Sequence, residues 1–145
     1  MAKTFQFRLE RLLDLRRVQE DLRKREFAEA NRAVLDHQQT LVKLLVEEDS
    51  AKNELRKRKQ SLLDLTALRL QEQYANALSR KIVQGYRDLQ GLQMKVVEKR
   101  REWADASKGV QVLERFRDRK REEHRLACDR EEQKFLDEVA QERSR

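Results

Sequence analysis

The sequence predicts an all-α fold, a long antiparallel two-helix coiled-coil hairpin with a C-terminal helical overhang. Proline is absent and only three of the 145 residues are glycine, whereas an average chain of this length carries about seven prolines. Because proline removes a helix hydrogen bond and glycine raises the entropy cost of a helix, this chain can be helical almost end to end. Charged residues make up 42% and hydrophobic residues 38%, which is typical of long helices with a narrow apolar seam.

A regular apolar spacing predicts the first arm of the hairpin over about residues 4–58. From Phe27, alternating steps of three and four residues reach Ala30, Val34, His37, Leu41, Leu44, Glu48, Ala51 and Leu55. Seven of these nine positions are apolar, and the alternation is typical of a coiled-coil seam. A run upstream holds a similar spacing in a different phase, with Phe5, Leu12, Leu15 and Leu22. We therefore expect a phase slip just before Phe27.

A second seam predicts the second arm over about residues 74–142. From Ala75, the same steps reach Leu78, Ile82, Gly85, Leu89, Leu92, Val96, Lys99, Trp103, Ala106, Val110 and Leu113. Ten of these twelve positions are apolar. Two interpretations of Gly85 are open, a close approach of the two helices or a tolerated weak position.

The turn is expected within about residues 59–73. Ser61 followed three residues later by Asp64 resembles a helix N-cap, and a break at Asp64-Leu65-Thr66 is equally compatible with the sequence. Folding back near residue 65 places Leu55 opposite Ala75 and leaves the residues after about 126 as an overhanging helix. The chain is then a single coiled-coil domain over 1–145. One continuous helix that dimerises is the alternative, but the separate phases and the break near Ser61 favour the hairpin.

The sequence carries no motif of a known catalytic centre. It has no GxGxxG, HExxH or CxxC motif, and its glycine-containing stretch 85–91 lacks the Lys-Ser/Thr ending of a phosphate-binding loop. His37 falls on the seam, where we expect a partly buried polar residue that fixes the register. Cys128 has no evident activating histidine. The prediction is therefore a protein that is not an enzyme and that takes no cofactor, no metal and no small-molecule substrate.

Charge is unevenly distributed along the chain, whose net charge is +7. Residues 1–25 carry eight basic against four acidic residues, and residues 99–121 carry nine against four. The hairpin places these two stretches side by side as a basic collar, whereas residues 122–145 reverse the sign with five against eight. A solvated surface and a docking site for an acidic protein or an anionic membrane are both open. We expect no nucleic acid as partner, because neither a sustained basic face with stacking aromatics nor a known module is visible.

Localisation is expected to be cytoplasmic. The N-terminus has no apolar run of signal-peptide length, and no stretch approaches the roughly 20 apolar residues that span a bilayer. The single cysteine fits a reducing compartment.

Two terminal motifs resemble the flagellar FliJ family. The start reads Phe5-Gln6-Phe7-Arg8-Leu9-Glu10-Arg11-Leu12-Leu13-Asp14-Leu15-Arg16, and the end reads Glu131-Glu132-Gln133-Lys134-Phe135-Leu136-Asp137-Glu138. Glu102-Trp103 and Leu113-Glu114-Arg115 stand where that family has similar residues. Length, missing proline and two helical runs agree, so the resemblance covers nearly the whole chain.

The resemblance implies a small cytoplasmic component of the flagellar type III export apparatus, peripherally associated with the cytoplasmic side of the membrane. Family members form an antiparallel coiled coil similar to the central stalk of rotary ATP synthases. The implied partners are the export ATPase hexamer, whose ring assembly the stalk promotes, the cytoplasmic domain of the export-gate membrane protein, and export chaperones. A virulence-injectisome stalk and a generic coiled-coil scaffold are the alternatives, and the Phe-x-Phe-Arg-Leu-Glu start favours the flagellar system.

The resemblance also suggests contact residues as hypotheses. For the ATPase ring they are Arg8, Arg11, Arg115, Arg119, Gln133, Asp137 and Glu138. For the export gate they are Thr40, Leu44, Tyr74 and Leu78, although Leu44 and Leu78 also belong to the seams. Some relatives have aromatics and a histidine where this chain has Glu47, Ala51 and Gly85, so the gate surface is not expected to match theirs in detail.

Overall fold

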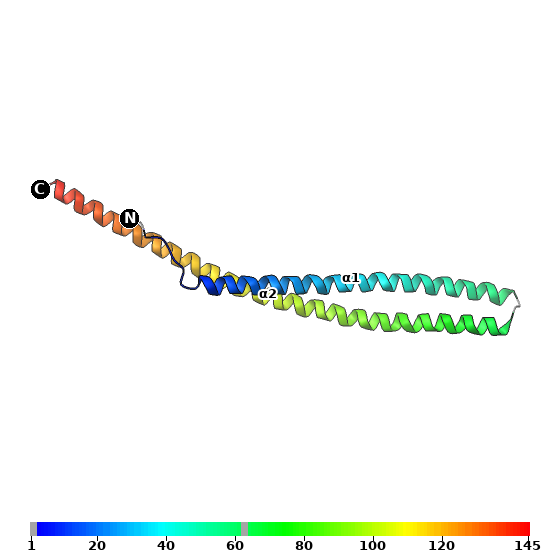
Figure 1. Ribbon diagram of the computed structural model, residues 1–145. Helices are drawn as coiled ribbons and strands as arrows, with labels where there is room; N and C mark the ends of the chain where they lie inside the picture. The colour runs from blue at the N-terminus through cyan, green and yellow to red at the C-terminus, as the bar shows by residue number, and fades with distance from the viewer. Residues whose placement is uncertain (1–2, 62–63) are drawn as a thin grey trace. The chain divides into compact units, whose positions relative to one another are not determined.

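Two long helices make up nearly all of the computed structural model, which describes residues 3–61 and 64–145. Helix α1 spans Glu10–Gln60 and helix α2 spans Leu65–Arg143 (Figure 1). The two helices run antiparallel and pack against each other, and the described residues contain no strand. The predicted all-α two-helix hairpin is therefore confirmed.

Contacts divide the chain into two compact units. The terminal unit comprises the residues up to Arg23 together with Glu102–Arg145, and the hairpin unit comprises Lys24–Arg101. Each unit thus contains a part of α1 and a part of α2. The single domain expected over 1–145 stays a prediction.

The two predicted seams form the packed core of the hairpin unit. Every seam position of α1 from Phe27 to Leu55, and every one of α2 from Ala75 to Lys99, is buried or half-buried. The most deeply buried apolar side chains, 3–7% exposed, are Ala30, Leu41, Ala51, Ala75, Leu78 and Ile82. A 3-4 apolar repeat keeps one stripe of each helix facing its partner, so burial follows the spacing.

The connection between the helices is shorter than the predicted turn of about 59–73. The Asp64 carboxylate accepts a hydrogen bond from the Thr66 N–H at 3.1 Å, so Asp64 caps α2. The predicted N-cap Ser61 is wrong, because its hydroxyl donates instead to the Arg58 carbonyl at the end of α1, at 3.2 Å. A carboxylate satisfies the free N–H groups of a first helical turn, so α2 begins at Leu65 rather than near 74. The turn prediction also covers residues 62–63, which lie outside the described part of the chain.

The register near the turn differs from the predicted one. Ala75 was expected opposite Leu55, but it packs in one cluster with Ala51 and Leu78, with Leu44 against them. The difference along α1 is about one helical turn of 3.6 residues. Because α1 ends at Gln60 and α2 begins at Leu65, the chain folds back earlier than the predicted residue 65.

In the N-terminal part of the terminal unit, the buried positions differ from the predicted ones, and α1 begins at Glu10 rather than at about residue 4. Leu13 is fully buried, whereas the predicted Leu12, Leu15 and Leu22 are 37%, 53% and 53% exposed. Counting back from Phe27 in the same steps of four and three reaches Leu13, so no phase slip is needed. The phase slip was predicted wrongly because polar residues, including Arg23, occupy the seam positions between Leu13 and Phe27.

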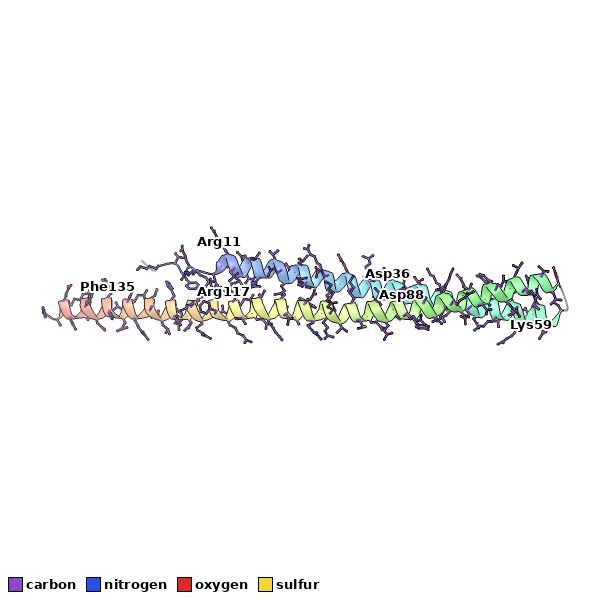
Figure 2. The ribbon with its side chains drawn as sticks, turned by 90° about the horizontal axis from the view of Figure 1, so that it is seen from below. Arg11, Asp36, Lys59, Asp88, Arg117 and Phe135 are labelled. Atoms are coloured by element: carbon purple, nitrogen blue, oxygen red, sulfur yellow. The ribbon has the colours of Figure 1, made fainter. Side chains whose placement is uncertain are left out.

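The predicted C-terminal overhang is present in the terminal unit. Helix α2 continues to Arg143, and every residue from Asp129 to Glu138 is exposed. Figure 2 marks Phe135 on this stretch, where its side chain is 65% exposed. At the start of the overhang, Arg125 forms ion pairs with Glu122 at 2.6 Å and with Asp129 at 3.1 Å on the same helix.

Candidate functional site

Exposed charges, aromatic rings and apolar side chains are the features from which a candidate site can be built. The described residues hold no group of three or more side chains that could bind a metal ion. No helix among them combines the length and apolar character that crossing a membrane requires.

Residues 3–9 form a non-helical segment that packs on α2 in the terminal unit. Its residues alternate, with Phe5, Phe7 and Leu9 half-buried and the residues between them exposed. A turn then leads into α1, where the Glu10 N–H donates to the Phe7 carbonyl at 3.2 Å. The Phe5 ring lies 5.6 Å from the His124 ring, centre to centre. The Phe7 ring lies 5.8 Å from the Phe116 ring. Sequence analysis placed this segment in the first helix and missed the alternation, which is the signal that identifies it.

This segment and α2 enclose an aromatic pocket with a basic rim. The pocket has a volume of about 580 Å³ and is lined by Phe5, Gln6, Phe7, Arg8, Leu9, Phe116, Lys120 and His124. The Lys120 ammonium lies 5.5 Å from the centre of the Phe116 ring, and the Arg121 guanidinium lies 5.8 Å from that of Phe5. Cations at this distance are attracted to the ring faces, so the basic residues help to hold the aromatic segment.

The basic collar divides into paired and exposed arginines. Arg17 forms an ion pair with Glu114, and Arg23 one with Glu102, each at 3.3 Å across the two helices. The predicted ring-contact arginines are all exposed, namely Arg8, Arg11, Arg115 and Arg119. The collar thus uses part of its charge to join the helices and presents the rest to solvent.

The remaining predicted ring-contact residues lie on the overhang. Gln133, Asp137 and Glu138 are exposed, and the Gln133 amide donates to the Asp137 carboxylate at 3.0 Å. All seven ring-contact residues therefore belong to the terminal unit.

The predicted gate-contact residues lie in the hairpin unit and differ in exposure. Leu78 is 3% exposed within the core cluster and Leu44 packs against it, so both serve the seam. Tyr74 is 51% exposed. Thr40 is also exposed, and its hydroxyl donates to the Asp36 carbonyl at 3.1 Å. Only Tyr74 and Thr40 offer mainly exposed side chains to a partner.

A comparison with known protein families identifies the family of this chain. The family model described as Flagellar FliJ protein matches residues 5–145. The chain belongs to the FliJ family. As a member, it is a component of the flagellar protein export apparatus. No curated protein and no solved structure matches it.

In the hairpin unit of this FliJ chain, the two helices approach each other closely at Gly85. The His37 Nε2 atom lies 2.7 Å from the Gly85 carbonyl oxygen, which fits an Nε2–H that donates to this oxygen. A Cβ atom added to Gly85 would collide with the Leu41 side chain. Of the two interpretations of Gly85, close helix approach is therefore correct, and His37 is the half-buried polar seam residue that was expected.

A second polar seam residue of the FliJ chain, Glu48, is satisfied by donors on both helices. Lys52 donates to it at 2.6 Å and the Ser79 hydroxyl at 3.2 Å. The hydrogen bond from Lys52 is the main cause that holds the pKa of Glu48 below its ordinary value, and partial burial opposes it. A carboxylate is tolerated at this seam position because both oxygens find a donor.

Sequence analysis of the FliJ chain also missed the neighbour of its single cysteine. Cys128 is half-buried, and its sulfur lies 3.9 Å from both ring nitrogens of His124, one helical turn earlier. The spacing of four residues is the signal that identifies this pair. Because the sulfur is equally far from both nitrogens, it faces the ring rather than one lone pair, and the geometry does not make the histidine a base for the thiol.

Proposed function

We propose that this FliJ chain is a stalk-like coiled coil whose terminal unit enters the ring of the export ATPase hexamer and promotes ring assembly. The observation that supports the proposal best is the set of exposed arginines in the terminal unit, Arg8, Arg11, Arg115 and Arg119, of which Arg8 also lines the aromatic pocket. Exposed charges favour fast and reversible association with an acidic surface. A part that must enter and leave a ring benefits from such reversibility.

The same proposal gives the hairpin unit the contact with the cytoplasmic domain of the export gate. Tyr74 and Thr40 directly precede the seam residues Ala75 and Leu41, so they flank the seam and are exposed. We propose them as gate contacts, with Leu44 as a half-buried neighbour, and we omit Leu78 because its side chain is buried. The chain would then act in the cytoplasm beside the membrane and escort export chaperones between the two machines.

ATP turnover by purified export ATPase, with and without the FliJ chain, tests ring insertion. The natural chain is expected to raise turnover and promote hexamers. Arg8→Glu with Arg11→Glu is expected to reduce the stimulation about tenfold, because reversed charges repel an acidic surface. The matched control is Arg32→Glu with Arg87→Glu, two exposed arginines of the hairpin unit. A generic scaffold or a stalk from a different secretion system would leave turnover unchanged, and that result would refute the proposal.

Binding of the purified gate domain tests the second contact. Tyr74→Ala is expected to weaken this binding while ATPase stimulation stays intact. Tyr86→Ala is the control, since both tyrosines are 51% exposed and Tyr86 flanks the seam on the other side. Equal losses in the two variants would argue against a gate contact at Tyr74.

A further inference from the structure

One side of the hairpin unit carries no charged residue over a long stretch. This side consists of the residues that directly follow each seam residue, from 28 to 45 in α1 and from 83 to 97 in α2. Six of these eleven positions hold large apolar residues, namely Leu35, Val42, Leu45, Val83, Tyr86 and Val97, and the other five hold alanine, asparagine or glutamine. In a chain with 42% charged residues, this uncharged face is a marked exception.

Contacts near the turn place these positions of both helices on one side of the hairpin unit. One further step along each seam reaches Arg58 in α1 and Gln71 in α2. Lys59 and Glu72 directly follow these two positions, and they form an ion pair at 3.6 Å. Ser79, which directly follows Leu78, donates across the seam to Glu48 at 3.2 Å. In an antiparallel pair, the positions that follow the seam in one helix flank those that follow it in the other, and these contacts agree.

The opposite side of the hairpin unit is charged. The residues that directly precede each seam residue include Asp36 and Lys43 in α1 and Lys81, Asp88 and Lys95 in α2. Figure 2 shows Asp36 and Asp88 at the same level of the two helices. Tyr74 and Thr40 belong to this charged side, so the uncharged face is separate from the proposed gate contact.

The uncharged face is exposed and two helices wide. Its six large apolar side chains are 40–60% exposed. Eighteen residues of helix extend about 27 Å, and two adjacent helices are about 20 Å wide. A single docked helix would cover the positions nearest the seam, Leu45 and Tyr86, whereas the outer positions such as Val42 and Val83 require a partner that is itself two helices wide.

We propose that the uncharged face binds the same face of a second copy of this chain, in an antiparallel four-helix dimer with twofold symmetry. A second copy offers two helices at the required spacing and no charge to desolvate. The face ends at Lys24 and Arg100 on one side and at Asp49 on the other. In an antiparallel pairing α1 lies on α1 of the other copy, which brings Lys24 of one copy to Asp49 of the other, whereas a parallel pairing brings the basic ends together.

The size of the face makes this dimer weak and reversible. Each copy contributes about 500 Å², so the pair buries about 1,000 Å², at the low end for specific interfaces. The monomer therefore prevails at low concentration and the dimer at high concentration. The dimer goes beyond the export role and uses no residue of the terminal unit.

Sedimentation equilibrium over a range of concentrations tests the dimer. The weight-average mass of the natural chain is expected to rise from 17.5 kDa towards twice that value. Val42→Glu is expected to weaken association at least about 100-fold, because symmetry buries the new carboxylate twice. Val46→Glu is the matched control and should associate as the natural chain does, since Val46 is 61% exposed but lies outside the face. Circular dichroism checks that both variants are helical, with Val83→Glu as a second variant of the face.

A charge exchange tests the orientation of the two copies. Lys24→Asp alone is expected to weaken the dimer, and adding Asp49→Lys is expected to restore it. A natural chain that stays at 17.5 kDa at every concentration would overturn the proposal. So would a mass beyond the dimer, an equal loss in Val46→Glu, or a charge exchange that fails to restore association.

Discussion

Gly85 matters because its missing side chain lets the two helices approach. Alanine there would gain helix propensity of about 1 kcal/mol, but its Cβ would collide with the Leu41 side chain. Overpacking of this kind costs about 1–3 kcal/mol. The sequence placed Gly85 on the seam, and only the structure could decide that the position is filled from the other helix.

Gly85→Ala is therefore expected to destabilise the chain by about 1 kcal/mol net. Gly91→Ala in the same helix is the control and should stabilise it by up to about 1 kcal/mol, because no atom lies within 4 Å of a Cβ placed there. Urea unfolding followed by circular dichroism measures both. Stabilisation by both alanines would contradict the close contact at Gly85.

Glu48 makes the stability of the hairpin unit depend on pH. Its pKa lies below the ordinary value of 4.5, mainly because Lys52 donates a hydrogen bond to it. A carboxyl with a lowered folded-state pKa stabilises the fold above its unfolded pKa, and this contribution is lost as the pH falls through the folded pKa. Acidification below about 4.5 should therefore remove it.

The urea midpoint of the natural chain, measured from neutral pH to below pH 4.5, tests this dependence. Glu48→Gln is expected to have a flatter profile, because its side chain does not titrate. Glu54→Gln, at an exposed position, is the matched control and should keep the profile of the natural chain. If Glu48→Gln and the natural chain lost stability in parallel, the pH dependence would have another source.

At the scale of the elements, the helix ends depend on single polar groups. Asp64 caps α2 through the Thr66 N–H at 3.1 Å, and loss of an N-cap typically costs about 1 kcal/mol. Asp64→Ala should lower the free energy of unfolding by about that amount. Ser61→Ala is the control and should be nearly neutral, since the Ser61 hydroxyl donates only to a carbonyl at the end of α1. Equal effects in chemical denaturation would show that Asp64 is not the cap that matters.

The non-helical segment before α1 is held mainly by aromatic rings. Phe7→Ala removes the ring that lies 5.8 Å from that of Phe116, so the segment should leave α2 and trypsin should cleave at Arg8 faster. Gln6→Ala, at an exposed position, should leave the cleavage rate unchanged. Mass spectrometry of a digestion time course measures both rates. A Phe7→Ala chain that is cleaved no faster would mean that other contacts hold the segment.

The seams of the long elements were predictable and their ends were not. From Phe27 to Leu55 the 3-4 spacing repeats often enough to identify the buried stripe without any contact information. The start of α2 was not predictable, because no glycine or proline marks it and both Ser61 and Asp64 are chemically able to cap a helix. The non-helical run from Phe5 to Leu9 was missed because it is too short to separate from the helix that follows.

The basic residues of the candidate site could be predicted from the sequence, but the ion pairs that they form could not. Charge counts located the basic collar, and Arg8 and Arg11, which were predicted to contact the ATPase ring, are exposed; the contact itself stays a prediction. Which arginines pair across the helices depends on the register, so the ion pairs of Arg17 and Arg23 followed only from the structure. The seam positions of Leu44 and Leu78 were visible in the sequence and already argued against their use as gate contacts.

At the scale of the whole molecule, the net charge of +7 should make its two associations respond oppositely to salt. Docking of the basic collar on an acidic ring should weaken as salt rises, because screening shortens the reach of the arginines. Self-association through the uncharged face should strengthen, because screening reduces the repulsion between two basic chains.

Raising sodium chloride from about 0.05 M to about 0.5 M is therefore expected to reduce ATPase stimulation and increase the fraction of dimer. Turnover assays and sedimentation in the same buffers measure the two responses. A response in the same direction for both would show that the two associations do not differ in their electrostatics as proposed.

The single thiol of the chain allows labelling at one site. Cys128 is half-buried beside His124, one turn from the ring on which Phe5 rests. One maleimide fluorophore therefore attaches at a unique and defined point, without any cysteine having to be removed or introduced. Its emission and anisotropy would report in real time whether the terminal unit moves from bulk water into the confined lumen of an assembling oligomer, as proposed.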